Sequence, residues 1–186
     1  EQYMIEGFNK TANVGYAHGE GEKWLDRWNE RKQAQGGYPL AEDQKKAAAY
    51  ALENPRLVSS IIGPAGTGKT TTMKAVAEAW QARYGAGSVL GLATSHKAVE
   101  ELRNSIGCDS KTIAMLMALN DPERIKAEIQ QEGRLQQQLR NASNPLERLL
   151  ARINITANHV TDSSNTIKPN QLIIVDEAGM VDSRNL

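Results

Sequence analysis

One glycine-rich turn restricts what this chain can fold into more than any other feature. Residues 63–70 read Gly-Pro-Ala-Gly-Thr-Gly-Lys-Thr: a glycine, four residues, then glycine, lysine and threonine. The apolar run 57–62 predicts a buried strand leading into this turn, and residues 69–83 predict a helix with one apolar face. Glycines let the backbone curl so that several amides point inward, and a helix N-terminus adds positive potential. The pattern therefore predicts a phosphate-binding loop rather than an ordinary glycine-rich turn.

Further apolar segments predict a parallel sheet around this loop. Residues 89–93 predict a second strand, so 57–93 is expected to form a β-α-β unit with a right-handed crossover. Residues 171–175 predict another strand, which ends in Asp176 and Glu177. In a sheet of this kind, ligands bind beyond the carboxyl ends of the strands. The fold class predicted is α/β.

The residues at the loop and at the acidic strand end suit phosphoryl transfer. Lys69 can neutralise the β- and γ-phosphates of a nucleotide, and Thr70 and Asp176 can hold Mg²⁺. Glu177 can orient and deprotonate the attacking water, so Lys69 and Glu177 are the candidate catalytic residues. The predicted nucleotide contacts cover the loop and the threonines after it: Gly63, Pro64, Ala65, Gly66, Thr67, Gly68, Lys69, Thr70 and Thr71.

Composition narrows the class of protein only slightly. Lys+Arg and Asp+Glu both number 22, so the net charge gives no sign of a polyanion partner, although a local basic groove would be compatible with it. Cys108 is the only cysteine, which excludes an intrachain disulfide, and the three histidines lack metal-ligand spacing. No signal-peptide pattern or membrane-spanning apolar run is present, so we expect a soluble cytoplasmic protein. The chain starts without methionine and stops soon after the acidic strand end, so we expect a piece of a longer protein.

Residues 1–37 predict a helical lead-in. Residues 1–15 are polar with little periodicity and are expected to be loosely ordered. A helix is expected over 21–35, where Trp24 and Trp28 recur at helical spacing. We interpret these tryptophans as packing anchors rather than as platforms for base stacking.

Residues 38–186 predict the main domain, with a helix over 42–53 and an apolar helical stretch over 112–119. An insertion is expected over 121–170, in which a solvated helical hairpin is favoured over a binding arm, because the excess of basic residues is small. Its last part, 154–170, is polar and predicts a flexible loop. The two hairpin helices could meet in a seam formed by Leu135, Leu139, Leu146, Leu149, Leu150 and Ile153.

Four motifs in order carry a resemblance to a known family: LAEDQ at 40–44, GPAGTGKTTT at 63–72, LATSHKAVEEL at 92–102 and LIIVDEAGMV at 172–181. The chain resembles superfamily 1 DNA helicases of the RecD-like group, and most of all the helicase part of conjugative relaxase–helicases of the MobF type. This resemblance implies a RecA-like P-loop NTPase domain that binds ATP and Mg²⁺. It also implies an ATPase that drives translocation on single-stranded DNA during conjugative plasmid transfer.

The resemblance implies further site residues. Gln44 would read the adenine edge, and a segment after the second strand would contact single-stranded DNA through Thr94, Ser95, His96 and Lys97. Residues 111–113 match the next DNA-proximal segment more loosely. A plain helix cap is the alternative interpretation of Thr94 to Lys97, and it is compatible with binding.

The chain also departs from this helicase pattern. The helicase pattern assigns no role to the insertion over 121–170. The sequence also shows no second RecA-like domain to complete the ATP site. It has no tyrosine cluster with a three-histidine metal site, as a nicking domain would have. We therefore expect a partnership with the rest of a longer chain, including a second RecA-like domain, and leave open whether that chain carries a relaxase domain. Alone, this piece is expected to hydrolyse ATP slowly or not at all. Two alternatives stay open: a P-loop enzyme acting on a small molecule, such as a kinase, and a non-catalytic helicase-derived binding domain.

Overall fold

The computed structural model describes residues 11, 14–64, 66–142, 144–150 and 167–176. The chain divides into two compact units, the first comprising Glu1–Thr112 with Pro169–Leu186 and the second Ile113–Lys168. The loose order predicted for residues 1–15 and the flexible loop predicted over 154–170 fall largely outside the described residues.

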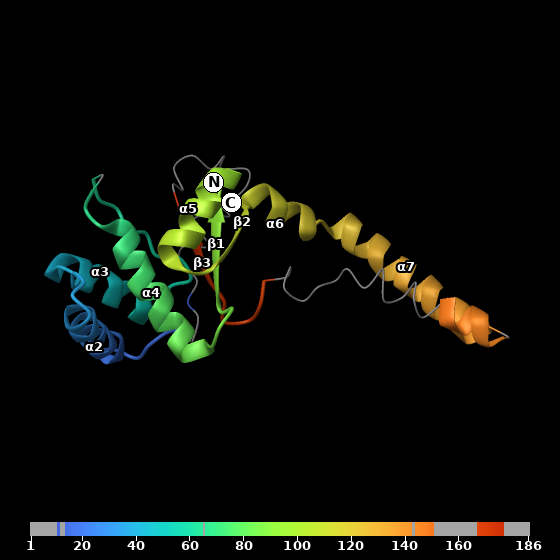
Figure 1. Cartoon of the computed structure of the whole chain (residues 1–186), viewed down its shortest axis with the longest axis horizontal. Helices are drawn as coiled ribbons and strands as arrows, with labels where there is room; N and C mark the ends of the chain where they lie inside the picture. Colours follow the sequence, from blue (N-terminus) through green and yellow to red (C-terminus); the bar gives the residue numbers. More distant parts are fainter. Residues whose placement is uncertain (1–10, 12–13, 65, 143, 151–166, 177–186) are drawn as a thin grey trace. The chain divides into compact units, whose positions relative to one another are not determined.

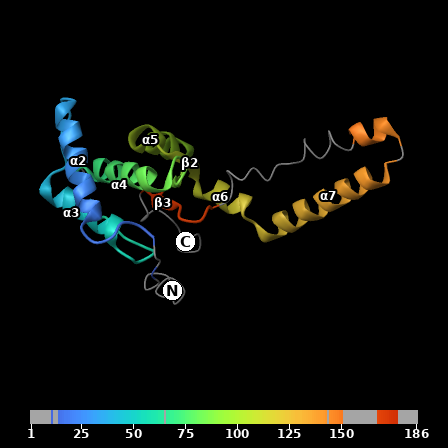
Figure 2. The ribbon, with the colours of Figure 1, turned by 90° about the horizontal axis from the view of Figure 1, so that it is seen from below.

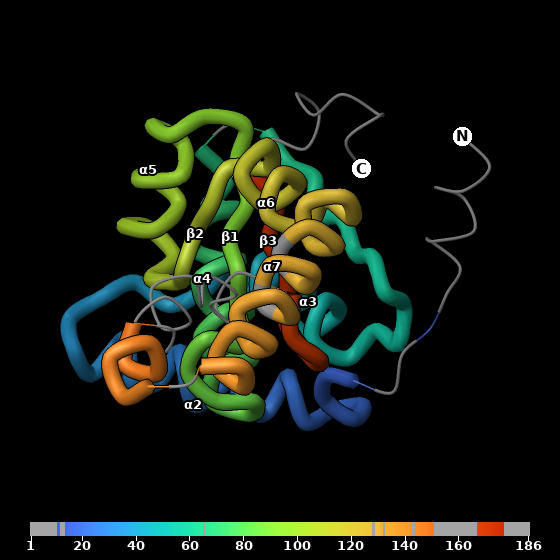
Figure 3. Tube along the Cα trace, turned by 90° about the vertical axis from the view of Figure 1, so that its right-hand side faces the viewer, coloured from blue at the N-terminus to red at the C-terminus, as the bar shows by residue number. Residues whose placement is uncertain are grey.

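The first unit contains a three-stranded parallel sheet (Figure 3). Strand β1 (Val89–Ala93) lies between β2 (Asp109–Thr112) and β3 (Leu172–Val175). All five residues of β1 are buried, as expected of a central strand whose two edges are both paired. The predicted α/β class with a parallel sheet is confirmed, together with the strands predicted over 89–93 and 171–175.

Strand β2 was not predicted, because its sequence Asp-Ser-Lys-Thr shows no apolar pattern. Ser110 is buried in it, and its hydroxyl donates to the Cys108 carbonyl at 3.2 Å. Gly91 of β1 makes room for this serine, since a Cβ at Gly91 would lie 2.5 Å from the Ser110 Oγ and 2.7 Å from Leu102. The strand is therefore stabilised by local hydrogen bonding and by a neighbouring glycine rather than by its own hydrophobicity.

The strand predicted over 57–62 is wrong for the described structure. The segment has no regular secondary structure, and Leu57, Val58 and Ile62 are 55%, 42% and 92% exposed. Both edges of β1 are occupied by β2 and β3, so the expected direct pairing of 57–62 with 89–93 is not made. A strand needs a partner for its backbone groups, and no described residue supplies one in a ladder.

Two helices pack on each other and on this sheet. Helix α4 (Lys69–Tyr84) contacts β1 and β3, and α5 (His96–Ile106) contacts β1 and β2. The buried face of α4 confirms the helix predicted over 69–83. Its Trp80 donates from Nε1 to the Asn170 carbonyl at 2.8 Å, which ties α4 to the turn before β3.

Helices α2 (Glu20–Ala34) and α3 (Glu42–Glu53) pack on each other and both on α4 (Figure 2). Trp28 of α2 is 2% exposed and donates from Nε1 to a Glu78 carboxylate oxygen on α4 at 2.7 Å. Trp24 is partly buried against the same core. The prediction that the tryptophans are packing anchors is confirmed for this pair. The core shared by these helices and the sheet includes Leu25, Trp28, Ala48, Leu52, Ala75, Trp80, Val89 and Leu102.

The second unit is helical, with α6 (Ile113–Leu119), the long α7 (Pro122–Asn141) and a further helical turn over 145–150 (Figure 1). Asp121 caps α7 by accepting a bond from the Glu123 amide at 3.1 Å. Of the predicted seam, Leu135 and Leu139 on α7 are half-buried, the leucines of the second helix are more than half exposed, and Ile153 lies outside the described residues, so the seam stays a prediction. The exposed seam residues are Leu146, Leu149 and Leu150.

Candidate nucleotide site

The glycine-rich loop runs directly into the N-terminus of α4. Gly66 and Gly68 have φ angles of 78° and 76°, in the left-handed region that glycine tolerates best. Gly68 is the N-cap of α4 and has no side chain that could accept bonds from the first-turn amides. The 16-residue helix thus presents amide donors and the positive end of its dipole next to the loop. This arrangement suits an anion.

Lys69 is the first residue of α4, and its ammonium group bends back over the loop. Nζ donates to the Gly63 carbonyl at 2.7 Å and to the Pro64 carbonyl at 2.8 Å. The Thr67 hydroxyl also donates to the Pro64 carbonyl at 2.8 Å. The loop is therefore closed by its own lysine and threonine. A bound polyphosphate would offer Lys69 anionic oxygens, which are stronger acceptors than these neutral carbonyls.

The three threonines after Lys69 occupy different environments. Thr70 and Thr71 are exposed on the first turn of α4, where their hydroxyls can reach solvent or a ligand. Thr72 is buried, and its hydroxyl donates to the Gly68 carbonyl at 3.2 Å. Thr72 therefore stabilises the helix start, whereas Thr70 and Thr71 are accessible, as their predicted role requires.

Gln44 in the first turn of α3 contacts the loop directly. Its Nε2 donates to the Thr67 carbonyl at 2.8 Å, and its Oε1 accepts from the Ala41 amide at 3.0 Å. Gly68 lies so close that a Cβ there would collide with the Gln44 amide group. The structure thus brings Gln44 and the loop together from 23 residues apart in sequence. Both ends of the Gln44 amide are engaged within the protein, and its predicted contact with adenine stays a prediction.

Asp176 lies at the carboxyl end of β3. Its backbone amide donates to the Leu92 carbonyl at 3.2 Å, which extends the pairing with β1 by one step. Since β1 and β3 are parallel, Asp176 shares one edge of the sheet with the segment that follows β1. Two predicted site residues, Ala65 and Glu177, lie outside the described residues.

The segment predicted to contact DNA follows β1 at that same edge. Thr94, Ser95, His96 and Lys97 are all exposed. Ser95 Oγ accepts from the Ala98 amide at 3.2 Å and so caps α5, as the alternative interpretation requires. Lys97 Nζ lies 3.9 Å from a carboxylate oxygen of Glu101 one turn later. The helix-cap role is confirmed for Ser95, and the DNA contact stays a prediction.

Among the residues that the structure describes, no group of three or more His, Cys, Asp or Glu side chains is placed to hold a metal ion. Within the same residues, no helix has the length and hydrophobicity needed to cross a lipid bilayer.

Sequence reasoning missed the contacts that hold the α3 end of the site. The bond from Gln44 to Thr67 depends on where α3 lies, which no local pattern specifies. Asn29 and Lys45 were also missed, although both contact the region around residues 40–45, as described below. The only available signal was the closely spaced pair of helices predicted before the loop.

The sequence is similar to one family of known domains and to three known proteins. The sequence model of the family described as AAA domain matches residues 39–186. "Conjugal transfer protein TraA" from Rhizobium radiobacter is 42% identical over 73 residues, which are 39% of this chain and 6% of that protein. The protein of the same name from Agrobacterium fabrum is 38% identical over 80 residues, 42% of this chain and 7% of that protein.

A further relative, "Probable conjugal transfer protein TraA" from Sinorhizobium fredii, is 41% identical over 73 residues, again 39% of this chain and 6% of that protein. The aligned part of the chain therefore spans only 6–7% of the length of these relatives. No solved structure matches the chain significantly. The resemblance to conjugative proteins that the motifs indicated is confirmed.

Proposed function

The chain belongs to the AAA domain family, and from this premise we propose that it is the ATP-binding part of a DNA helicase acting in conjugal DNA transfer. The names of the three relatives support a role in conjugal transfer and disfavour the alternative of a kinase that acts on a small molecule. The order of the four motifs supports a helicase. Since the chain covers so little of each relative, helicase activity and translocation on single-stranded DNA belong to the proposal.

One observation carries the nucleotide-binding part of this proposal. The turn through Gly66 and Gly68 delivers Lys69 to the start of α4, with its ammonium group 2.7–2.8 Å from two loop carbonyls. A flexible cationic side chain, uncapped helix amides and a glycine-rich turn meet in residues 63–70. Together they supply the donors and the positive charge that a nucleotide's phosphates require.

Each site residue has a proposed role when the nucleotide is bound. Lys69 neutralises charge on the β- and γ-phosphates, and the Thr70 hydroxyl with the Asp176 carboxylate would hold Mg²⁺. Mg²⁺ supplies charge neutralisation at the phosphate oxygens. Glu177, placed by sequence alone directly after Asp176, would orient the attacking water and accept its proton. Exposed Thr70 and a half-buried strand-end carboxylate fit a hard, oxygen-seeking cation.

Contact with DNA is proposed for the exposed segment after β1. Hydroxyl, imidazole and ammonium groups gather there in Thr94, Ser95, His96 and Lys97. Such donors suit phosphate oxygens and carry little base specificity. Gln44 is proposed as the adenine contact through the second hydrogen of Nε2 and the second lone pair of Oε1, so that its bonds to Thr67 and Ala41 are kept.

Titration of the 186-residue chain with a fluorescently labelled ADP in the presence of Mg²⁺ tests the proposal. Saturable micromolar binding is expected. Lys69→Ala should weaken it at least about tenfold, because a charge-assisted contact to phosphate is lost. Lys74→Ala is the matched control, since it removes the same charge from the same helix beyond its first turn. Its affinity should stay within about twofold of the unmodified chain.

Two outcomes would count against this function. A folded sample that shows no saturable binding at high micromolar ADP would remove the nucleotide site. An equal loss in Lys69→Ala and Lys74→Ala would show that general positive charge, rather than the loop, attracts the nucleotide.

A further inference from the structure

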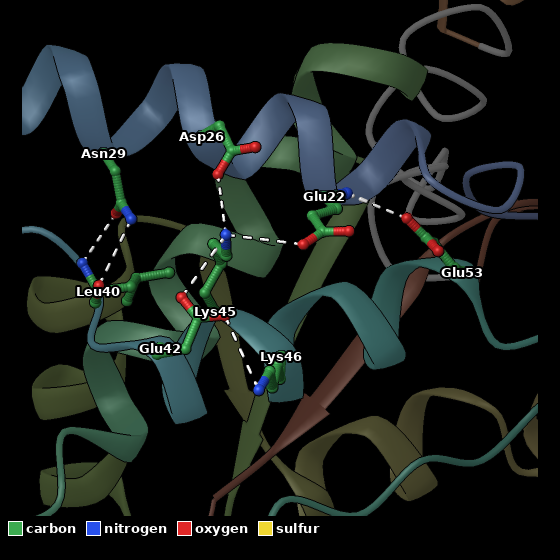
Figure 4. A network of polar contacts seen from close by, with 8 residues as sticks. All are labelled: Glu22, Asp26, Asn29, Leu40, Glu42, Lys45, Lys46 and Glu53. Atoms are coloured by element: carbon green, nitrogen blue, oxygen red, sulfur yellow. Dashed lines mark hydrogen bonds and ion pairs between the residues drawn. The ribbon is translucent and has the colours of Figure 1, made fainter.

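Helix α2 lies before residue 39, where the family match begins, but it is bonded to the segment that leads into α3 (Figure 4). Asn29 of α2 accepts a hydrogen bond at Oδ1 from the Leu40 amide at 2.8 Å. Its Nδ2 donates to the Leu40 carbonyl at 3.4 Å. One side chain therefore satisfies both backbone polar groups of Leu40, whose own side chain is buried. This pair of bonds defines the backbone position just before α3.

A second attachment lies immediately after Gln44. Lys45 Nζ lies 3.1 Å from Asp26 and 3.6 Å from Glu22, both on α2, and 3.7 Å from Glu42 on its own helix (Figure 4). The Lys45 side chain is only 15% exposed. Its hydrogen bond to Asp26 and the neighbouring carboxylates raise its pKa despite partial desolvation, so it stays cationic at neutral pH. The first turn of α3 is thus attached to α2 on both sides of Gln44.

Gln44 connects the first turn of α3 to the phosphate-binding loop. Its Oε1 accepts from the amide of Ala41, the residue next to Leu40, and its Nε2 donates to the Thr67 carbonyl. A continuous series of bonds and adjacent residues therefore leads from Asn29 through Leu40, Ala41 and Gln44 to Thr67. The loop receives part of its shape from a helix outside the matched region.

We propose that Asn29 is a positioning residue for the nucleotide site, because it holds the first turn of α3 where Gln44 bonds to the loop. This inference rests on the proposed nucleotide binding. A loop held in its binding shape loses less conformational freedom when the ligand arrives, so its affinity is higher. Breaking the contact at Asn29 leaves Gln44 with a less defined position and the loop with less support.

A double-mutant cycle distinguishes a residue that positions Gln44 from a residue that only stabilises the fold. If Asn29 acts through Gln44, removing Gln44 also removes the effect of Asn29. If Asn29 only stabilises the fold, its loss costs the same affinity whether or not Gln44 is present. The coupling between the two positions is therefore the decisive quantity.

The experiment measures the dissociation constant of labelled ADP with Mg²⁺ for the 186-residue chain and three variants: Asn29→Ala, Gln44→Ala and the double change. Each single change is expected to weaken binding about three- to tenfold, the effect of one lost hydrogen bond. The double change should be less than about twofold weaker than Gln44→Ala alone. Glu30→Ala, at an exposed position next to Asn29, is the matched control and should bind like the unmodified chain.

Thermal unfolding monitored by circular dichroism shows whether each variant is folded. Asn29→Asp keeps the acceptor for the Leu40 amide and should lose less affinity than Asn29→Ala; it replaces the alanine in the cycle should that variant not fold. An equal fold-loss on removing Asn29 in both Gln44 backgrounds overturns the inference, as does unchanged affinity in Asn29→Ala. An unmodified chain that binds no ADP overturns the proposed function itself, which distinguishes the two failures.

Discussion

Glu53, the last residue of α3, caps the N-terminus of α2. The N-cap of α2 is Gly19, which has no side chain to accept hydrogen bonds from the first amides. The Glu53 carboxylate accepts instead from the Gly19 amide at 2.9 Å and the Glu22 amide at 3.0 Å. Its side chain is only 12% exposed. A carboxylate at this position satisfies two orphan donors and faces the positive end of the helix dipole.

This contact predicts a specific acid sensitivity. Burial raises the pKa of Glu53, but the backbone bonds from Gly19, Glu22 and Gly21, together with the nearby His18, hold the pKa below its usual value. A lowered pKa means that the stabilisation is complete above the unfolded-state pKa of about 4.3 and is lost as the pH falls through the folded-state value. The free energy of unfolding should therefore decrease below about pH 4.3.

Glu53→Gln removes this titration and should cost about 1 kcal/mol at pH 7, the scale of a lost cap. Its unfolding free energy, from urea denaturation at pH 7 and near pH 3.5, should change less between the two conditions than that of the unmodified chain. Glu30→Gln, on the exposed face of α2, is the control and should keep the full acid dependence. A Glu53→Gln variant that loses as much stability in acid as the unmodified chain would contradict this role.

The sequence predicted the identity of the loop residues but not their contacts. A glycine-lysine-threonine turn has its own local geometry, so Gly68, Lys69 and Thr70 were assigned from pattern alone. Gln44 entered only through resemblance, and its bond to Thr67 depends on the packing of α3. The role of Asn29 depends on a third helix again. Contacts between helices depend on tertiary packing, so hydrophobic periodicity along the sequence could not predict them.

At the scale of elements, amphipathic helices were predicted best. The helix expected over 42–53 is observed as α3 with those bounds, and α4 extends the expected 69–83 by one residue. Their apolar faces repeat every turn, and this signal survives whatever tertiary structure follows. Strands were predicted less well, because polar β2 forms through its neighbours, whereas the apolar segment 57–62 has no strand partner among the described residues. Hydrophobicity indicates burial, but pairing decides whether a strand forms.

The exposed segment 57–62 yields an element-scale prediction. Because no described residue pairs with its backbone, its amides should exchange with deuterium at rates close to those of an unstructured peptide. Amides of the central strand β1 should exchange orders of magnitude more slowly and serve as the internal reference. Hydrogen exchange followed by mass spectrometry of peptides covering both segments measures this contrast. Protection of 57–62 equal to that of β1 would show that the strand expected from sequence does form in solution.

At the scale of the whole molecule, the second unit, Ile113–Lys168, contributes none of the described residues of the candidate nucleotide site. The loop, Gln44 and Asp176 all belong to the first unit. Thr112 pairs with Ala93 at one end of β1, and Leu172 pairs with Val89 at the other. With strands about 4.8 Å apart and about 3.3 Å per residue, the two ends lie roughly 16 Å from each other. A flexible linker of about ten residues has an r.m.s. span of roughly 16–19 Å and can join them.

Replacing residues 113–168 by a ten-residue glycine/serine linker should therefore leave a folded protein with an intact nucleotide site. We expect one cooperative thermal transition, loss of the helical signal contributed by α6 and α7, and ADP affinity within about threefold of the full chain. Adding Lys69→Ala to the shortened protein should weaken that affinity about tenfold, which would show that the same loop still binds. A shortened protein without a cooperative transition would instead mean that the first unit needs the second to fold. A folded but non-binding one would mean that residues of the second unit complete the site.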